Sequence, residues 1–354
     1  MKIFECDHCG QTVYFDNDTC VACGHRLGFA PDDIALYSIR QGEGELWHKA
    51  DDESRRFRLC ENTGIGVCNW LVDEDDDETF CLACRHNNLI PDTTTEIGLN
   101  RFKRIGAAQR HLFYSLLRWG VDTPTRKQDP QNGLVFDFLE DTVEADGSVT
   151  PAMTGHDDGL ISLRAAEADD VTREIIRDQM NEPYRTMLGH FRHEVGHYVW
   201  DRLVRDDRRL ESFRAVFGDE REDYQAALQR HYENGPPPDW PEHHVSAYAA
   251  THPWEDFAES FAHALHIVDT LETARAFGLA VDDARLEPLG DPYKCVSGKR
   301  LAEAWIPLTI AMNAIHKSMG QQDFYPFVLT PDIVAKIDYI VTMLNGPKAG
   351  KAAT

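Results

Sequence analysis

The chain has 354 residues, of which 42% are hydrophobic and 27% are charged, a composition typical of a globular protein with a sizeable buried core. Its 36 Lys and Arg stand against 60 Asp and Glu, so the formal net charge is −24. Such a charge repels phosphate backbones and anionic lipid surfaces, so we expect neither nucleic acid nor a membrane as a partner.

The start of the chain, MKIFECDHCG, has neither the basic nor the apolar region of a signal peptide. The most apolar late stretch, residues 301–315, is interrupted by Glu303, Pro307 and Asn313 and is too short to span a bilayer. We therefore expect a cytoplasmic protein. In that reducing compartment cysteines are expected to bind metal rather than to form disulfides.

Eight of the nine cysteines lie in the first 84 residues and form two groups of four. The first group has two C-x2-C pairs separated by ten residues, a spacing that places four thiolates around one tetrahedral zinc ion. The second group is less regular, because seven residues separate its first two cysteines. We predict two structural zinc ions, with interleaved pairing as the alternative. The groups are Cys6, Cys9, Cys20 and Cys23, and Cys60, Cys68, Cys81 and Cys84.

The composition changes at PDTTTEIG, residues 91–98. We therefore predict a zinc-ribbon domain over residues 1–92, a second domain over 93–346 and a flexible tail over 347–354. Residues 1–90 hold 8 Lys and Arg and 18 Asp and Glu, a net charge of 8 − 18 = −10. This charge argues against nucleic-acid binding by the zinc ribbon. It favours a protein partner, substrate recruitment or structural support of the second domain.

In the second domain, residues 100–120 have helical periodicity and a stop signal at Gly120. Residues 134–139, 142–150 and 159–163 are expected to form a small antiparallel meander, and residues after 165 are expected to be helical apart from loops such as 233–242. The predicted fold is α+β: a tandem zinc-ribbon-like module, then a mostly helical domain with a small antiparallel sheet. Cys295 stands alone there and is expected to be a buried, inert thiol.

The segment GHFRHEVGHYVW, residues 189–200, predicts a metal site on a helix that begins near Pro183. His193 and His197 are one turn apart, so both imidazoles lie on one side, and zinc binds such a pair readily. Glu194 is placed to reach a metal-bound water without being a ligand. This is the H-E-x-x-H pattern of zinc peptidases; a solvated helix face is the alternative. The opposite side is an apolar stripe of Leu188, Phe191, Val195, Val199 and Leu203.

A third ligand is expected from the segment SAYAATHPWEDFAESFAHALH, residues 246–266, which predicts a helix after a Pro-Trp pair. Glu255 and Glu259 are one turn apart on one face of that helix. One carboxylate can approach the metal, and the other can hydrogen-bond a ligand imidazole. Spacing alone leaves the third ligand open; the candidates are Glu255, Glu259, Asp256, His263 and His190.

Four segments resemble bacterial zinc-binding metallopeptidases that carry an N-terminal zinc-ribbon domain: TGHDDGLI, EPYRTMLGHFRHEVGHYVWD, HYENGPP and SAYAATHPWEDFAESFAHALHI. The second half is similar to gluzincins, and its E-D-F-A-E helix resembles the E-F-F-A-E helix of lethal-factor-type toxin proteases, with Asp256 in place of an aromatic residue. The resemblance implies a zincin-like fold in which Glu255 binds zinc and Glu259 supports a ligand histidine. The resemblance also implies that Tyr248 stabilises the oxyanion. Without the resemblance, Tyr248 would be interpreted as a core aromatic residue.

The leading hypothesis is a zinc-dependent peptidase with one catalytic and two structural zinc ions, in which Glu194 is the general base and the substrate is a peptide or protein. The alternative is a non-catalytic zinc-ribbon adaptor whose peptidase-like half is a protein-binding scaffold. Zinc content separates the two, since the enzyme needs three ions and the adaptor only two. We expect residues 159–163 to be the strand nearest the cleft, with a buried core strand as the alternative.

Overall fold

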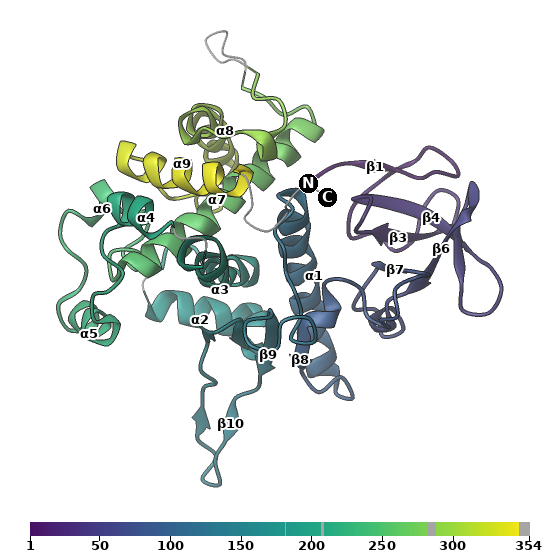
Figure 1. Cartoon of the computed structure of the whole chain (residues 1–354), viewed down its shortest axis with the longest axis horizontal. Helices are drawn as coiled ribbons and strands as arrows, with labels where there is room; N and C mark the ends of the chain where they lie inside the picture. The colour runs from purple at the N-terminus through teal and green to yellow at the C-terminus, as the bar shows by residue number, and fades with distance from the viewer. Residues whose placement is uncertain (181, 207–208, 282–287, 347–354) are drawn as a thin grey trace. The chain divides into compact units, whose positions relative to one another are not determined.

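The computed structural model describes residues 1–180, 182–206, 209–281 and 288–346. The chain divides into two compact units, Met1–Met180 and Asn181–Thr354 (Figure 1). The first unit runs past the predicted domain boundary at residue 92, because the helix after that boundary packs against the cysteine-rich part. The tail predicted as flexible, residues 347–354, lies outside the described residues.

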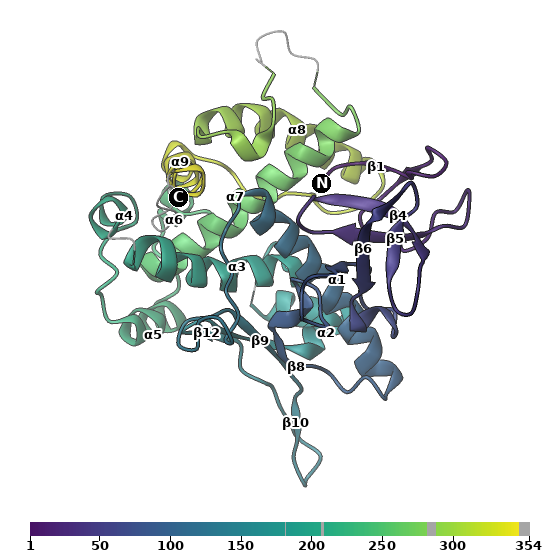
Figure 2. The ribbon, with the colours of Figure 1, turned by 45° about the vertical axis from the view of Figure 1, so that its right-hand side comes forward.

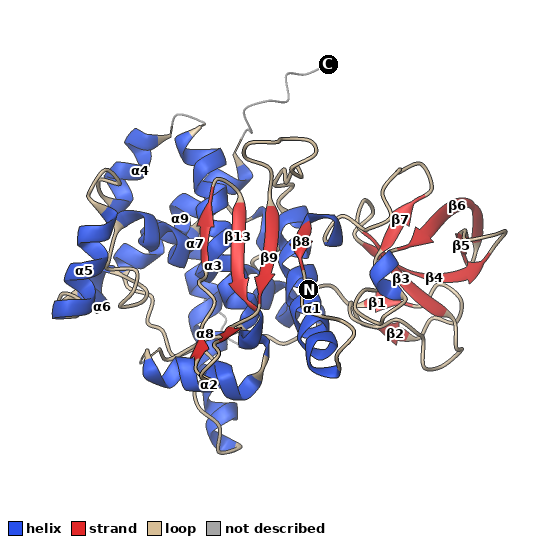
Figure 3. Cartoon of the chain, turned by 90° about the horizontal axis from the view of Figure 1, so that it is seen from below, coloured by secondary structure: helices blue, strands red, loops and turns tan. Residues whose placement is uncertain are grey.

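The cysteine-rich part of the first unit is built on short antiparallel strands. Strand β1 (Phe4–Glu5) pairs with β2 (Thr12–Val13). A five-stranded antiparallel sheet follows in chain order, from β3 (Arg26–Ala30) and β4 (Ala35–Gln41) through β5 (Trp47–Lys49) and β6 (Asp52–Leu59) to β7 (Leu71–Asp73). Its strands appear as a group separate from the other sheet of this unit in Figure 3. Phe29 lies at the centre of the aromatic core, with ring centroids 4.8 Å from both Phe15 and Trp70.

Helix α1 (Glu96–Arg118) confirms the helix predicted over residues 100–120. The Thr95 side chain caps its start by accepting a hydrogen bond from the Gly98 amide, and Gly120 follows its end with φ +57°. Tyr114 faces Phe15 with 5.4 Å between ring centroids, and His111 Nε2 lies 2.8 Å from an Asp16 oxygen. These contacts join α1 to the cysteine-rich part.

The second sheet of this unit corrects the predicted antiparallel meander. Its strand order is β12-β13-β9-β8, with bounds Gly155–Asp157, Leu160–Arg164, Val135–Leu139 and Asn87–Leu89. Strand β9 is parallel to both β13 and β8, and only β12 and β13 are antiparallel. Parallel pairing is accessible because a long connection separates β9 from β13. That connection carries a separate hairpin, β10 (Thr142–Val143) and β11 (Val149–Thr150).

Strand β13 is also not an edge strand. It pairs with β12 on one side and β9 on the other, and Ile161 and Leu163 are buried. The burial of Ile161 and Leu163 fits the alternative of a buried core strand. That residues 159–163 are the strand nearest the cleft stays a prediction. Helix α2 (Asp170–Gln179) ends the unit.

The described residues of the second unit form helices joined by loops, as predicted. Helix α7 (Pro253–Ala276) is its longest element and packs against α3 (Met187–Trp200), α8 (Gly298–Ser318) and α9 (Pro331–Asn345), as Figure 2 shows. Three shorter helices are α4 (Leu210–Phe217), α5 (Tyr224–Asn234) and α6 (Trp240–His243). Cys295 is buried, as expected.

Helix α3 differs from its prediction at both ends. It begins at Met187, with Thr186 as the capping side chain, rather than near Pro183. At its end a π-helical turn over Asp201–Arg205 shifts the phase, so that Val204 is buried where the stripe predicted Leu203. Among the helices of the described residues, none combines the length and the apolar character that a membrane span needs.

Candidate metal centres

The eight N-terminal cysteines gather as two quartets in chain order, not interleaved. The sulfur atoms of Cys6, Cys9, Cys20 and Cys23 lie within 4.8 Å of one another, and so do those of Cys60, Cys68, Cys81 and Cys84. The sulfur atoms of Cys6 and Cys23 are 3.6 Å apart, and those of Cys9 and Cys20 are 3.7 Å apart. A tetrahedral zinc with bonds of about 2.3 Å separates its sulfurs by about 3.8 Å, so the quartets have the dimensions of zinc sites.

Local backbone geometry positions the first quartet. Gly10 and Gly24 directly follow the second position of each C-x2-C turn with φ +73° and +75°, a conformation that favours glycine. Their amides donate to the Cys6 and Cys20 carbonyls, both at 2.8 Å. Each pair of thiols is therefore held on a tight turn that points the sulfurs inward.

The second quartet is the more buried of the two, with all four cysteines inaccessible, whereas Cys9 of the first is exposed. Backbone amides of Trp70 and Cys81 lie 3.4 Å from the sulfurs of Cys68 and Cys60. Burial and the neighbouring thiols raise the pKa of Cys81 well above its ordinary value. Four buried sulfur atoms at this spacing fit a divalent metal ion.

In the second unit, α3 and α7 bring the predicted ligands together. His193 Nε2 lies 3.1 Å and His197 Nε2 3.4 Å from Glu255 Oε2. Ligands at about 2.0 to 2.1 Å from a tetrahedral zinc lie about 3.3 Å apart, so these three atoms match a zinc site. Glu259 Oε1 lies 2.7 Å from His193 Nδ1, on the far side of the ring.

The donor set also fits a cation electrostatically. Glu255 is 1% exposed, and its Oε2 has no hydrogen-bond partner among the described residues. Burial lowers the pKa of His193, but the adjacent Glu255 and Glu259 outweigh it and raise that pKa well above its ordinary value. The two carboxylates therefore favour positive charge at this point, which a zinc ion would provide.

Glu194 lies beside the three histidines of α3. It is 6% exposed, and its Oε1 is 3.3 Å from His190 Nε2. Burial alone would raise the pKa of Glu194, but the hydrogen bond from His190 and the nearby imidazoles lower it. The carboxylate is therefore ionised and able to accept a proton.

Tyr248 reaches the centre from the loop before α7, with its ring centroid 5.8 Å from that of His193. Burial and the charge of Glu255 raise the pKa of Tyr248, so the hydroxyl stays protonated. Ser246 shapes this loop: its hydroxyl accepts from the Ala249 amide at 3.1 Å and donates to Glu259 Oε2 at 2.6 Å.

Two further residues of this centre, Ser246 and Tyr224, are not predicted by any sequence pattern. The Tyr224 hydroxyl donates to Glu255 Oε1 at 2.7 Å. The only local signal is the Asp223 cap at the start of α5, which predicts a helix start but not the contact with a residue 255 − 224 = 31 positions away.

The other candidates for the third ligand have different partners. Asp256 lies 2.6 Å from Lys336 Nζ and 3.2 Å from His244 Nδ1. His263 Nδ1 is 2.7 Å from the Tyr325 hydroxyl. His190 faces Glu194, and Glu259 faces the distal nitrogen of His193, so Glu255 is the carboxylate that the structure places between both imidazoles.

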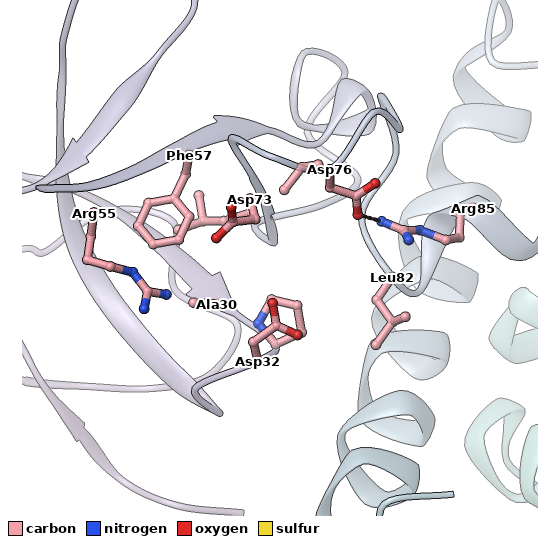
Figure 4. Close-up of a pocket in the computed structure, with 11 residues that line it drawn as sticks. Ala30, Asp32, Arg55, Phe57, Asp73, Asp76, Leu82 and Arg85 are labelled. Carbon is pink, nitrogen blue, oxygen red and sulfur yellow. Dashed lines mark hydrogen bonds and ion pairs between the residues drawn. The ribbon is translucent and has the colours of Figure 1, made fainter. Parts of the chain in front are cut away.

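The described part of the chain has cavities whose walls contain none of the proposed metal ligands. A pocket of about 80 Å³ in the first unit has Phe57 and Leu82 among its walls, with Arg85 bonded to Asp76 at 2.5 Å (Figure 4); it is far smaller than the roughly 300–1,000 Å³ of typical small-molecule sites. A cavity of about 510 Å³ in the second unit is lined in part by His231 and Ala249. Since the His231 ring lies 6.3 Å from that of Tyr248, this cavity is beside the His/Glu centre.

Comparison with known families agrees with these two kinds of centre. A zinc-ribbon domain family matches residues 3–95, and the family described as "Putative zinc-binding metallo-peptidase" matches residues 98–343. The cysteine quartets lie in the first match and the His/Glu centre in the second. The chain belongs to this zinc-binding metallopeptidase family.

Similar proteins occur in mycobacteria. The chain is 41% identical over 347 residues to Uncharacterized protein Rv2568c of Mycobacterium tuberculosis (strain ATCC 25618 / H37Rv) and to Uncharacterized protein Mb2598c of Mycobacterium bovis. The alignments cover 98% of this chain and 96% of each relative. No solved structure matches the chain.

Proposed function

We propose that the protein is a zinc-dependent metallopeptidase that hydrolyses peptide bonds in a peptide or protein substrate. The observation that carries this proposal is the convergence of His193 Nε2, His197 Nε2 and Glu255 Oε2, with Glu194 and Tyr248 beside them. A purely structural site has no physical need for a buried ionised carboxylate and a protonated tyrosine at its side. The cysteine quartets would hold two further, structural zinc ions.

Zinc held by His193, His197 and Glu255 would supply Lewis acidity, which lowers the pKa of a water and polarises a peptide carbonyl. Glu194 can accept the proton of the attacking water and later deliver it to the leaving amine, because its carboxylate is ionised. The Tyr248 hydroxyl can donate to the carbonyl oxygen as that atom gains negative charge. Glu259 holds the His193 ring so that Nε2 faces Glu255.

The substrate has room on one side of this centre. The cavity of about 510 Å³ beside Tyr248 is lined by small apolar side chains such as Ala227 and Ala249, and by polar ones such as Asn234. We propose that it receives a side chain next to the cleaved bond. The acidic zinc ribbon is proposed to bind a protein, either the substrate or a separate partner.

The decisive experiment compares wild type with Glu194→Gln in a mass-spectrometric screen of peptide libraries, alongside zinc counts. Wild type is expected to cleave and to hold three zinc ions. The variant is expected to keep three and to lose roughly 10²- to 10⁴-fold in turnover, the usual contribution of a general base. Glu211→Gln, at an exposed position of α4, is the matched control and should cleave normally.

Two results would contradict the proposal. Full turnover in Glu194→Gln would remove Glu194 from the mechanism. A wild-type protein that holds only two zinc ions, and whose count does not fall in His193→Ala, would leave a zinc-ribbon adaptor as the better description.

A further inference from the structure

Glu255 uses its two carboxylate oxygens for different partners. Oε2 lies between the Nε2 atoms of His193 and His197, at 3.1 and 3.4 Å. Oε1 accepts a hydrogen bond of 2.7 Å from the Tyr224 hydroxyl. A carboxylate can bind a metal through one oxygen or both, so whatever engages Oε1 bears on how Glu255 would bind zinc.

We propose that Tyr224 is a positioning residue that holds Glu255 so that one oxygen, Oε2, faces the two imidazoles. This inference rests on the proposed zinc site. A single-oxygen carboxylate and two imidazoles make three ligands, which leaves a fourth tetrahedral position for water. A carboxylate free to turn could bind through both oxygens and crowd that position.

Tyr224 is itself held firmly enough to do this. It is the first residue of α5, whose start is capped by Asp223, with its side chain 3.0 Å from the Ala226 amide. The Tyr224 ring meets the rings of His252 and Trp254 edge to face, with centroids 5.3 and 5.8 Å away. The residue before Glu255 therefore packs against the same tyrosine that bonds the Glu255 side chain.

The two tyrosines of the centre have separate roles in this arrangement. A tyrosine hydroxyl has one proton to donate, and that of Tyr224 goes to Glu255. The Tyr248 hydroxyl lies close enough to Tyr224 for the two residues to influence each other's pKa. Tyr224 therefore acts on the metal ligand Glu255, whereas the hydroxyl proton of Tyr248 can be donated to the substrate.

The test is the zinc affinity of the His/Glu centre in full-length protein, measured by graded chelator competition. The relevant ion is the one that disappears in His193→Ala. Tyr224→Phe is expected to weaken its binding roughly 10- to 100-fold, the usual effect of removing a partner of a metal ligand. Tyr248→Phe should bind zinc like wild type. Tyr232→Phe, at an exposed position on the same helix α5, is the matched control and should also bind normally.

A second readout does not depend on affinity or activity. It uses protein with zinc in the cysteine quartets and Co²⁺ in the His/Glu centre. In Tyr224→Phe, Glu255 could bind Co²⁺ through both oxygens and make the ion five-coordinate. The visible absorption should then be weaker, because a five-coordinate Co²⁺ site absorbs less than a four-coordinate one. Thermal unfolding of the chelated variant, unchanged from wild type, would show that the effect is not a loss of folding.

The outcomes are separable. Wild-type zinc affinity and wild-type cobalt absorption in Tyr224→Phe would overturn the positioning role and leave the proposed function intact. Wild type could instead hold three zinc ions and cleave no peptide, while Tyr224→Phe weakens zinc binding at the third site. That result would overturn the proposed function and leave the positioning role intact. A wild-type protein that holds only two zinc ions would overturn both the positioning role and the proposed function.

Discussion

The cysteine quartets and the His/Glu centre gather metal-binding atoms in two different ways. Each quartet comes from one short stretch, residues 6–23 or 60–84, and its sulfurs are set by tight local turns. The His/Glu centre joins two helices, and Glu255 follows His197 by 255 − 197 = 58 residues. The position of a sulfur therefore depends on local conformation, whereas the position of Glu255 depends on how α3 and α7 pack.

The supporting contacts differ as well. Around the quartets they are mainly backbone amides near sulfur, with the Ser38 hydroxyl 3.0 Å from the Cys6 sulfur. The His/Glu centre instead has side-chain partners from three separate segments, Glu259, Ser246 and Tyr224. Four thiolates saturate a structural ion, while three ligands with an open position need outside support to keep their orientation.

The largest expected effect follows from the quartets. A structural zinc contributes roughly 10–16 kcal/mol to the folding of small zinc modules. Cys81→Ser, in the fully buried quartet, is therefore expected to lose one zinc ion and to open residues 1–90 to proteolysis. His193→Ala should also lose one ion but stay folded, because α3 and α7 pack through apolar side chains such as Phe191 and Phe261.

Cys295→Ser is the control for that experiment, since Cys295 is buried but belongs to neither quartet. Its zinc content should equal that of wild type. A Cys81→Ser protein that keeps all its zinc and resists protease would show that the two kinds of centre do not differ as argued.

The next effect concerns the packing of α3 against α7. Arg192 bonds Asp269, which also accepts from the Tyr293 hydroxyl, and all three side chains are buried. Asp269→Ala leaves the guanidinium buried without its carboxylate, which typically costs about 3–5 kcal/mol. Urea unfolding should show this loss, together with weaker zinc binding at the adjacent His193.

An exposed ion pair provides the comparison. Lys317 Nζ lies 2.8 Å from an Asp323 oxygen, with side chains 65% and 32% exposed. Lys317→Ala should cost no more than about 1 kcal/mol. Equal costs for the two substitutions would mean that burial does not make the Arg192–Asp269 pair important.

The same contrast explains what could be predicted from the sequence. Cysteine spacing predicts two quartets, and the structure gathers the thiols that way, because each set is local. Periodicity predicts α1 and α7, because the apolar side of a helix can be recognised within a single segment of the sequence. The parallel pairing of β9 with β13 and the contact of Tyr224 with Glu255 depend on chain crossings and packing, which no local pattern encodes. Only the family resemblance favours Glu255 over its neighbours as the third ligand, because such a resemblance carries long-range information.

A pH effect is expected from α7, where burial lowers the pKa of His263 to about 4 from an ordinary 6.5. Between these values the unfolded chain takes up a proton that the folded chain does not. Stability from this group is therefore fully present above pH 6.5 and is lost as the pH falls toward 4, by about 3 kcal/mol at most. Urea unfolding of chelated protein across this range would measure it.

His263→Gln should reduce that dependence without abolishing it, because burial also lowers the pKa of His266 and of His86. His316→Gln on α8 should leave the dependence unchanged. If both variants retain the wild-type slope, His263 is not the group responsible.

The smallest expected effect tests how closely α3 and α7 must approach. A Cβ added at Gly196, between Glu194 and His197, would lie 2.9 Å from the Ala258 Cα and 3.2 Å from the Ala258 oxygen. Because backbone cannot rotate aside, Gly196→Ala must separate the helices, at a typical cost of about 1–3 kcal/mol. That separation should weaken zinc binding at the His/Glu centre, while the quartets keep their zinc.

Gly189→Ala is the control. The nearest atom to its added Cβ is a Thr186 side-chain oxygen at 3.0 Å, which can move, so this substitution should cost less stability. Equal zinc affinity in Gly196→Ala and wild type would show that the ligand geometry tolerates a wider helix spacing than the close contact implies.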